Sequence, residues 1–261
     1  MASCRSRASP IISSEKELKR FLSTINSSST LFLDLEGRNL SRDGTITILT
    51  ILAHPNGDLR LIDVLALGTS AFTTAASGGY TLKSILESSG IAKFMWGAKQ
   101  DADALWALYG VCLTGVTDIQ FLEHASRVGN KVNHEVRGLA KAVQFDLELG
   151  AVERNSWLRT KKDVTALMPS NIFTARPMKP RTIQYCANDV VHLPALRDLY
   201  RRRISDEWYA EVKERSERLL EEARSPSNDP RSFGALRKIL GPWGSGSQQP
   251  ARRVEDESAD P

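Results

Sequence analysis

The sequence predicts an α/β protein built around a mixed β-sheet, and three observations support this class. Three strand-like apolar segments lie between residues 31 and 63, close enough in sequence to form an antiparallel meander. After residue 80, helical and strand patterns alternate. The composition, with 41% apolar and 25% charged residues over 261 positions, is ordinary for a globular protein with a sizeable core.

The first quarter of the chain contains one predicted helix and the three strands. Residues 1–13 are expected to be flexible, and Ser14 is a suitable N-cap for the helix that follows. The alternation of residues 31–35 predicts the first strand. The segment 45–64 predicts two more strands, joined by a turn at 55–58 where proline, asparagine and glycine cluster.

The remaining elements follow one another up to residue 224. We expect a helix at 82–90, a strand at 91–97, a helix at 101–109, a short strand and a helix over 115–128, and a helix at 136–144.

The last part of the chain is expected to contain an irregular segment, then a long helical segment, and then a disordered tail. Residues 153–181 contain three prolines and are expected to be irregular, and a long helical pattern then begins near Thr182, with an interruption at Pro194. From Ser225 the chain carries five of its eleven prolines and an acidic end, so 225–261 is expected to be largely disordered. Residues 14–224 are therefore predicted to form one domain.

Positive charge is concentrated in one stretch. The whole chain has a net charge of +4, which favours an anionic partner. Between Glu153 and Arg181 there are seven basic residues and only two acidic ones. The basic residues are Arg154, Arg159, Lys161, Lys162, Arg176, Lys179 and Arg181. The stretch is either a solvated loop or a surface that contacts a phosphate backbone.

Cysteine usage and hydropathy indicate an intracellular protein. The three cysteines are far apart, which suggests a reducing compartment rather than a disulfide framework. No apolar run approaches the ~18 residues of a membrane span, and the first residues lack the apolar segment of a secretory signal. Nuclear, cytoplasmic and mitochondrial locations all remain open.

Two acids lie on one face of the first predicted strand. Asp34 and Glu36 occupy alternate positions, so their side chains point to the same face, about 6–7 Å apart along the backbone. Leu31, Leu33 and Leu35 form the opposite, apolar face. Two carboxylates at this spacing can bind one divalent cation. The alternative is a pair of solvated acids at a strand edge.

A third acid lies at the start of the helix at 101–109. Asp101 shares its helical face with Leu105 and Leu108, so we expect it to point inward. Asp103 aligns with the weaker face that begins at Ala107 and is expected to point outward. The alternative for Asp101 is a helix N-terminal acid that the macrodipole favours.

A tyrosine and a fourth acid share a face of the predicted helix near Thr182. Tyr185 and Asp189 are four residues apart, and Leu193 and Leu196 continue nearly the same stripe. The alternative is a Tyr–Asp pair on the helix surface. A buried carboxylate is costly unless it is paired or bound to a metal, so the four acids together predict a divalent-metal site.

The order of these motifs resembles the DEDDy branch of the 3′–5′ exonuclease domains, which includes ribonuclease D and the Werner-type exonuclease domain. The similar segments are Asp34-Leu35-Glu36, Asp101 within DADALWALYG, and Tyr185 to Asp189 within YCANDV. The resemblance extends from about Leu31 to Tyr200, and it includes exonuclease-domain proteins of filamentous fungi. It implies a ribonuclease H-like (DnaQ-like) fold, with a mixed five-stranded sheet flanked by helices.

The resemblance also implies an activity. It implies hydrolysis of the terminal phosphodiester at a 3′ end of RNA or DNA, with release of nucleoside 5′-monophosphates. Asp34, Glu36, Asp101 and Asp189 would hold two Mg²⁺ or Mn²⁺ ions about 4 Å apart, and Tyr185 would orient the attacking water. The candidates for nucleic-acid contacts are Arg154, Arg159, Lys161, Lys162 and Arg176.

Two other functions are open at this point. The first is a catalytically weak or inactive nucleic-acid-binding or adaptor protein on the same fold. The second is an unrelated α/β protein in which the four acids have no common function. The sequence contains no glycine-rich phosphate-binding loop that would support this alternative. Trp157 could stack on a base, although a tryptophan of the core is the favoured interpretation.

Overall fold

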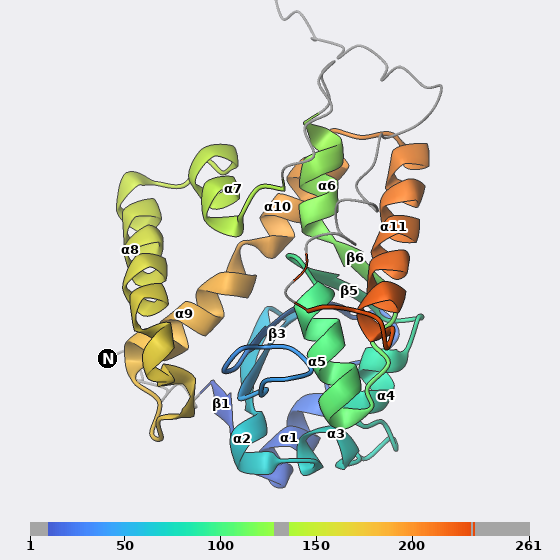
Figure 1. Cartoon of the computed structure of the whole chain (residues 1–261), viewed down its shortest axis with the longest axis vertical. Helices are drawn as coiled ribbons and strands as arrows, with labels where there is room; N and C mark the ends of the chain where they lie inside the picture. Colours follow the sequence, from blue (N-terminus) through green and yellow to red (C-terminus); the bar gives the residue numbers. More distant parts are fainter. Residues whose placement is uncertain (1–9, 128–135, 231, 233–261) are drawn as a thin grey trace, which may run out of the picture.

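The computed structural model describes residues 10–127, 136–230 and 232. A six-stranded mixed sheet forms its centre, with the strand order β1-β4-β3-β2-β5-β6 (Figure 1). The strands are β1 (Ile11–Ile12), β2 (Thr30–Glu36), β3 (Ile48–His54), β4 (Asp58–Asp63), β5 (Ala92–Met95) and β6 (Val116–Asp118). The β2–β3–β4 unit is an antiparallel meander, and β1, β5 and β6 each pair with their neighbour in parallel. The predicted class and the meander are confirmed.

The sheet has one strand more than the family resemblance implies. Ile11 and Ile12 pair with Leu61 and Ile62 of β4, and Ile12 is buried because it is an apolar residue at the margin of the core. The segment expected to be flexible therefore ends in a strand, and its residues 1–9 lie outside the described residues.

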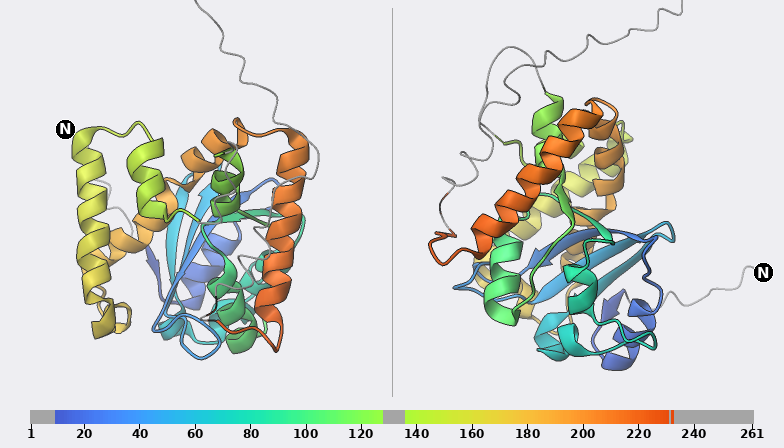
Figure 2. Two further views of the ribbon diagram at one scale, coloured as in Figure 1. Left: turned by 45° about the horizontal axis from the view of Figure 1, so that its top comes forward. Right: turned by 90° about the vertical axis from the view of Figure 1, so that its right-hand side faces the viewer.

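Helices cover both faces of the sheet (Figures 1 and 2). Those before β6 are α1 (Glu15–Leu22), α2 (Val64–Leu67), α3 (Ser70–Thr73), α4 (Leu82–Glu87) and α5 (Lys99–Tyr109). Those after it are α6 (Ile119–Ser126), α7 (Leu139–Asp146), α8 (Ala151–Leu167), α9 (Pro180–Val191), α10 (Leu193–Arg201) and α11 (Asp206–Arg224). The leucines of β2 pack on α1 and α4 on one face, and α9 covers the opposite face of β2, β3 and β4.

The expectation of an irregular segment at 153–181 is wrong for its first half. Residues 151–167 form α8, a helix of 17 residues that packs beside α9 (Figure 1). The three prolines of the segment all follow the helix, so none interrupts its hydrogen bonds. Trp157, Thr160 and Val164 form its buried stripe at spacings of three and four residues.

Trp157 belongs to the core, as the sequence favoured. Its side chain is buried, and its indole N–H donates a hydrogen bond of 3.1 Å to the backbone carbonyl of Asn188 on α9. This contact holds the middle of α8 against the helix that carries Asp189.

Asp103 corrects a second expectation. It is buried rather than outward-facing, and its carboxylate accepts bonds of 2.7 Å from both the backbone N–H and the Nε of Arg42. Leu108, predicted to face the core, is 37% exposed. The loop after β2 and the end of α11 cover the first turns of α5, and Asn228 also contacts Asp103. The pattern within one helix carries no information about these distant segments.

The described residues beyond α11 contact the body of the protein. Lys99 of α5 donates hydrogen bonds to the backbone carbonyls of Asp229 (3.1 Å) and Ser232 (2.7 Å). The rest of the expected tail, residues 231 and 233–261, lies outside the described residues.

A buried aspartate fixes the start of α5. The carboxylate of Asp118, at the end of β6, accepts hydrogen bonds from the backbone N–H groups of Gly97 (2.9 Å), Ala98 (3.0 Å) and Gln120 (2.9 Å). Gly97 has a φ of 78°, a conformation that glycine adopts without strain. The turn that brings Asp101 toward β2 therefore depends on a residue of the neighbouring strand.

We expect Asp118→Ala to lower the free energy of unfolding by about 2–4 kcal/mol, because three backbone N–H groups, one buried and two partly buried, would lose their acceptor. Urea unfolding followed by circular dichroism measures the change. Asp163→Ala is the matched control, since Asp163 forms an exposed pair with Arg181 and its loss should cost less than about 0.5 kcal/mol. Equal effects of the two variants would contradict this role for Asp118.

Candidate metal centre

The C-terminal half of β2, which carries Asp34 and Glu36, extends beyond the end of its pairing with β5. β3 pairs with β2 along its whole length, whereas β5 pairs with it only from Thr30 to Phe32. Beyond this point, the start of α5 takes the place of a strand, and the backbone of Leu35 hydrogen-bonds to the carboxyl of Asp101. Asp34 and Glu36 thus lie where a strand, a helix terminus and α9 meet.

A glycine lets the chain leave the strand directly after Glu36. A Cβ on Gly37 would lie 1.7 Å from the backbone carbonyl oxygen of Thr45, so no other residue fits without moving the backbone. The backbone carbonyl of Glu36 accepts hydrogen bonds of 2.8 Å from both the N–H and the hydroxyl of Thr47. These contacts hold the following loop against the end of β2 and fix Glu36 at the last position of that strand.

Three of the four predicted acids converge at ligand spacing. One carboxylate oxygen from each of Asp34, Glu36 and Asp189 lies within 4.8 Å of the other two. Asp34 and Glu36 come from β2, and Asp189 comes from α9, which packs across β2 and β3. Oxygen ligands in this arrangement suit Mg²⁺ or Mn²⁺.

Asp101 lies beside this group rather than within it. Its charge raises the pKa of Asp34, after burial and the charge of Asp189. Among the residues that the structure describes, Asp34 Oδ2 and Asp101 Oδ1 are buried without a hydrogen-bond partner. A buried carboxylate oxygen without a donor is costly, and a divalent cation is the kind of group that would compensate such oxygens. The donor set therefore fits a divalent metal.

Burial raises the pKa of every carboxyl in the centre, and repulsion by the other acids adds to it at Asp34 and Glu36. For Asp34 the causes are burial, then the charges of Asp189 and Asp101; for Glu36 they are burial, then the charge of Asp34. Burial also raises the pKa of Asp189, although Lys161 opposes the shift, and it raises the pKa of Asp101 to about 7. Without a metal, the centre therefore retains carboxyl protons near neutral pH.

Tyr185 is buried over the same centre. Burial, followed by the charge of Asp189, raises the pKa of its phenol far above the ordinary value, so the hydroxyl keeps its proton. A hydrogen bond with Tyr185 in turn lowers the pKa of Asp189. Tyr185 can therefore orient a ligand through its hydroxyl, and it is unsuited to accept a proton.

Lys161 lies in this centre, although the sequence indicated only a surface cation. Its Nζ is 2.6 and 2.7 Å from the two carboxylate oxygens of Asp189 and 2.9 Å from the hydroxyl of Tyr185. Burial opposes the charged ammonium, but the charges of Asp189, Asp34 and Glu36 outweigh it and raise the pKa of Lys161. A helical interpretation of 151–167 would have found the residue, because Lys161 follows the buried Trp157 by one helical turn.

Of the other residues predicted to contact nucleic acid, two are bonded to groups of the protein itself and two are exposed. Arg176 binds both carboxylate oxygens of Asp63, at 2.5 and 2.6 Å, and Arg154 donates to the backbone carbonyl of Leu149. Both therefore stabilise the fold. Arg159 and Lys162 are exposed on α8.

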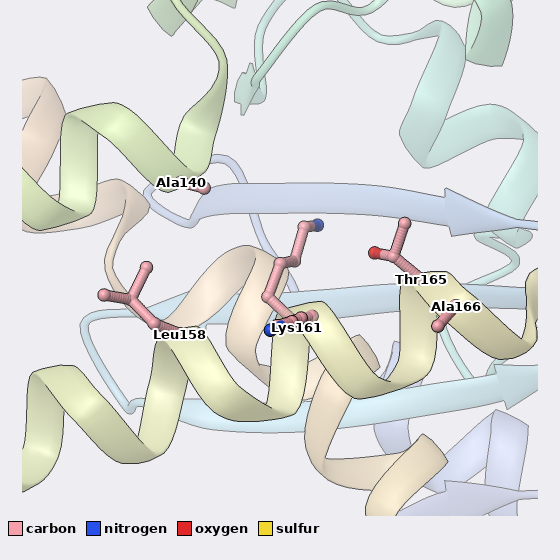
Figure 3. Close-up of a pocket in the computed structure, with 6 residues that line it drawn as sticks. Ala140, Leu158, Lys161, Thr165 and Ala166 are labelled. Carbon is pink, nitrogen blue, oxygen red and sulfur yellow. The ribbon is translucent and has the colours of Figure 1, made fainter.

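An open pocket of about 540 Å³ lies between α7 and α8 (Figure 3). Its lining consists of Ala140, Leu158, Lys161, Lys162, Thr165 and Ala166. Lys161 and Thr165 project from the same side of α8. Since Lys161 also contacts Asp189, the pocket adjoins the carboxylate group.

Comparison with known proteins identifies what the whole chain is similar to. The family described as 3′–5′ exonuclease matches residues 10–204, and no curated protein matches the sequence significantly. No helix among the described residues has both the length and the apolar character needed to span a bilayer.

Solved structures of other proteins share the fold. Trypanosoma brucei RNase D, solved with GMP, has a TM-score of 0.70 and 19% identity over 90% of this chain and 72% of its own. Escherichia coli RNase D, an exoribonuclease involved in structured RNA processing, has a TM-score of 0.56 and 18% identity over 82% of this chain and 50% of its own. Brucella melitensis NrnC with bound Mg²⁺ has a TM-score of 0.52 and 14% identity over 74% of this chain and 83% of its own.

The raised pKa of Asp101 predicts a pH-dependent stability. In the unfolded chain this carboxyl ionises near pH 4, and in the folded protein near pH 7. Between these values the unfolded state binds fewer protons, so the contribution of Asp101 to stability falls as pH rises. In the presence of chelator, the free energy of unfolding of Asp101→Asn minus that of the wild type should therefore increase by about 2 kcal/mol or more between pH 4.5 and pH 7.5. A difference that does not change with pH would contradict the shift.

Proposed function

Because the chain belongs to the 3′–5′ exonuclease family, we propose that it is an active, metal-dependent 3′–5′ exonuclease. In this proposal it removes nucleoside 5′-monophosphates from the 3′ end of RNA or DNA. The observation that carries the proposal is the convergence of Asp34, Glu36 and Asp189 at ligand spacing, with Asp101 adjacent. A fold member that had lost its activity would have no need to keep three buried acids and a fourth that is partly buried, which are costly to maintain.

Asp34, Glu36 and Asp189 would hold one divalent cation, and Asp34 and Asp101 would hold a second. Mg²⁺ or Mn²⁺ bound there would activate water and neutralise the charge that develops on the phosphoryl group. The Mg²⁺ in the related NrnC structure supports the choice of ion. The raised carboxyl pKa values mean that cation binding would displace protons from these side chains.

Tyr185 would position the attacking water with its hydroxyl. Its high pKa keeps the phenol protonated, so its contribution is orientation by a hydrogen bond rather than proton removal. Packing of its ring against Phe173 fixes the direction of the hydroxyl. Tyr185 and Asp189 lie one turn apart on α9, so a single helix sets both groups.

The exposed side of α8 would hold the nucleic-acid backbone. Arg159 and Lys162 are exposed on this helix, and Lys162 lines the pocket beside the acids. The pocket is large enough for part of a nucleotide. The T. brucei relative has been solved with RNA U12 and with GMP, which makes RNA the first substrate class to test.

A second candidate is a nucleic-acid-binding protein with little or no activity. The ion pair between Lys161 and Asp189 favours it, because the lysine binds both oxygens of a predicted metal ligand. In that case the protein would bind the same 3′ ends without shortening them.

Matched RNA and DNA oligonucleotides, labelled so that the 3′-terminal nucleotide can be followed, test the proposal. We expect release of 5′-monophosphates with Mg²⁺ or Mn²⁺ and none with chelator. Asp189→Asn should reduce the rate at least about 100-fold, and Tyr185→Phe about 10- to 100-fold with metal binding retained. Tight binding without any release, on both substrates and with both ions, would support the second candidate instead.

The salt dependence of binding tests the surface of α8. Neutralising Arg159 and Lys162 together, as Arg159→Gln and Lys162→Gln, should lower the slope of log K against log salt concentration by about 1 to 2. The measurement uses the catalytically impaired Asp189→Asn background and fluorescence anisotropy. The control is Lys16→Gln with Lys19→Gln, two exposed lysines on α1. A reduction of equal size in the control would show that net charge, not this surface, sets the slope.

A further inference from the structure

Lys161 is the one basic side chain in direct contact with the acidic centre among the residues that the structure describes. Its ammonium binds both oxygens of Asp189 and the hydroxyl of Tyr185, and it lies 4.4 Å from the centroid of the Tyr185 ring. The side chain of Lys161 is 25% exposed, and that of Asp189 is 4% exposed. The pair therefore spans the border between the pocket and the buried acids.

The charges explain why a lysine is stable in this position. Four carboxyls gather with one ammonium in a volume from which water is largely excluded. A buried acidic cluster needs either protons or cations. Lys161 supplies one positive charge from within the chain. It binds the two carboxylate oxygens with which Asp189 would otherwise bind a metal ion.

We propose that Lys161 is an internal counter-ion of the metal-free centre, which competes with divalent cations for Asp189 and so lowers the metal affinity of the site. The inference rests on the proposed metal site. It adds that Lys161 determines the cation concentration at which this site becomes occupied. Metal binding would require the ammonium to leave Asp189 or to remain beside the cation at an electrostatic cost.

The position of Lys161 on α8 allows such an exchange. Its side chain lines the open pocket (Figure 3), and its ammonium also contacts Asp189 of the acidic centre. Rotation of a flexible lysine side chain about its own torsions would move Nζ from Asp189 toward the pocket. The helix itself can stay in place, because Trp157 and Val164 remain packed in the core.

Isothermal titration of the metal-free protein with Mn²⁺ at pH 8 tests the proposal without any nuclease assay. Lys161→Met removes the charge and keeps the length of the side chain, and Lys161→Arg keeps a positive charge. We expect Lys161→Met to bind Mn²⁺ at least about tenfold more tightly than the wild type, with a larger rise in melting temperature on Mn²⁺ addition. Lys161→Arg should stay near the wild type.

Lys162→Met is the matched control, because this neighbouring lysine lines the same pocket and is exposed. Its Mn²⁺ affinity should stay within about twofold of the wild type. Circular dichroism reports folding, and Lys161→Gln provides a second neutral variant should Lys161→Met fail to fold.

The outcomes separate this inference from the proposed function. Unchanged or weaker Mn²⁺ binding in both neutral variants, with binding retained by the wild type, would overturn the role of Lys161 and leave the exonuclease proposal intact. A gain of equal size in Lys162→Met would overturn it as well, since general charge would then explain the effect. No Mn²⁺ binding by the wild type or any variant would refute the metal site, and with it the proposed function.

Discussion

The repulsion among four carboxyls, three of them buried and that of Asp34 partly buried, is the constraint on which the rest of the structure depends. Asp34, Glu36, Asp101 and Asp189 come from three elements that are distant in sequence, and folding brings them into one water-poor volume. Such a cluster costs free energy that the core around it must offset. The apolar faces of β2 and α9 and the hydrogen bonds of Asp118 supply the rigid frame that holds these acids together. A cation would then recover part of this free energy at the moment of binding.

The sequence predicted those parts of the site that depend on local periodicity. Alternation in β2 placed Asp34 and Glu36 on one face, and the four-residue spacing placed Tyr185 above Asp189. The meander, the class of the fold and the family were also predicted, because each rests on patterns contained within short segments. Burial of Asp101 at the first turn of α5 was predicted as well, although its neighbour Asp103 was not.

The failures share a physical cause, which is contact with a segment remote in sequence. Asp103 is buried because the loop carrying Arg42 folds over it. Ile11–Ile12 form a strand because β4 offers a free edge to them. The helix α8 was missed because prolines just beyond its end made the whole segment look irregular, and Lys161 was therefore assigned to a surface. A lysine within a basic run gives no sign that its partner is an aspartate 28 residues later.

The placement of Lys161 changes how the positive charge of this chain should be understood. Arg159, Lys161 and Lys162 are neighbours in sequence, yet the helix turns one of them inward and leaves the other two exposed. The inward lysine contacts Asp189 at distances below 3 Å, where solvent screening is weak. In the proposed function the outward residues would act on the nucleic acid through water and salt, so their effect would depend strongly on ionic strength. Under the proposed function, one helix would therefore combine two kinds of electrostatic control, one over the metal site and one over the nucleic acid. The helix α9 would connect them, because it packs on α8 and carries both Tyr185 and Asp189.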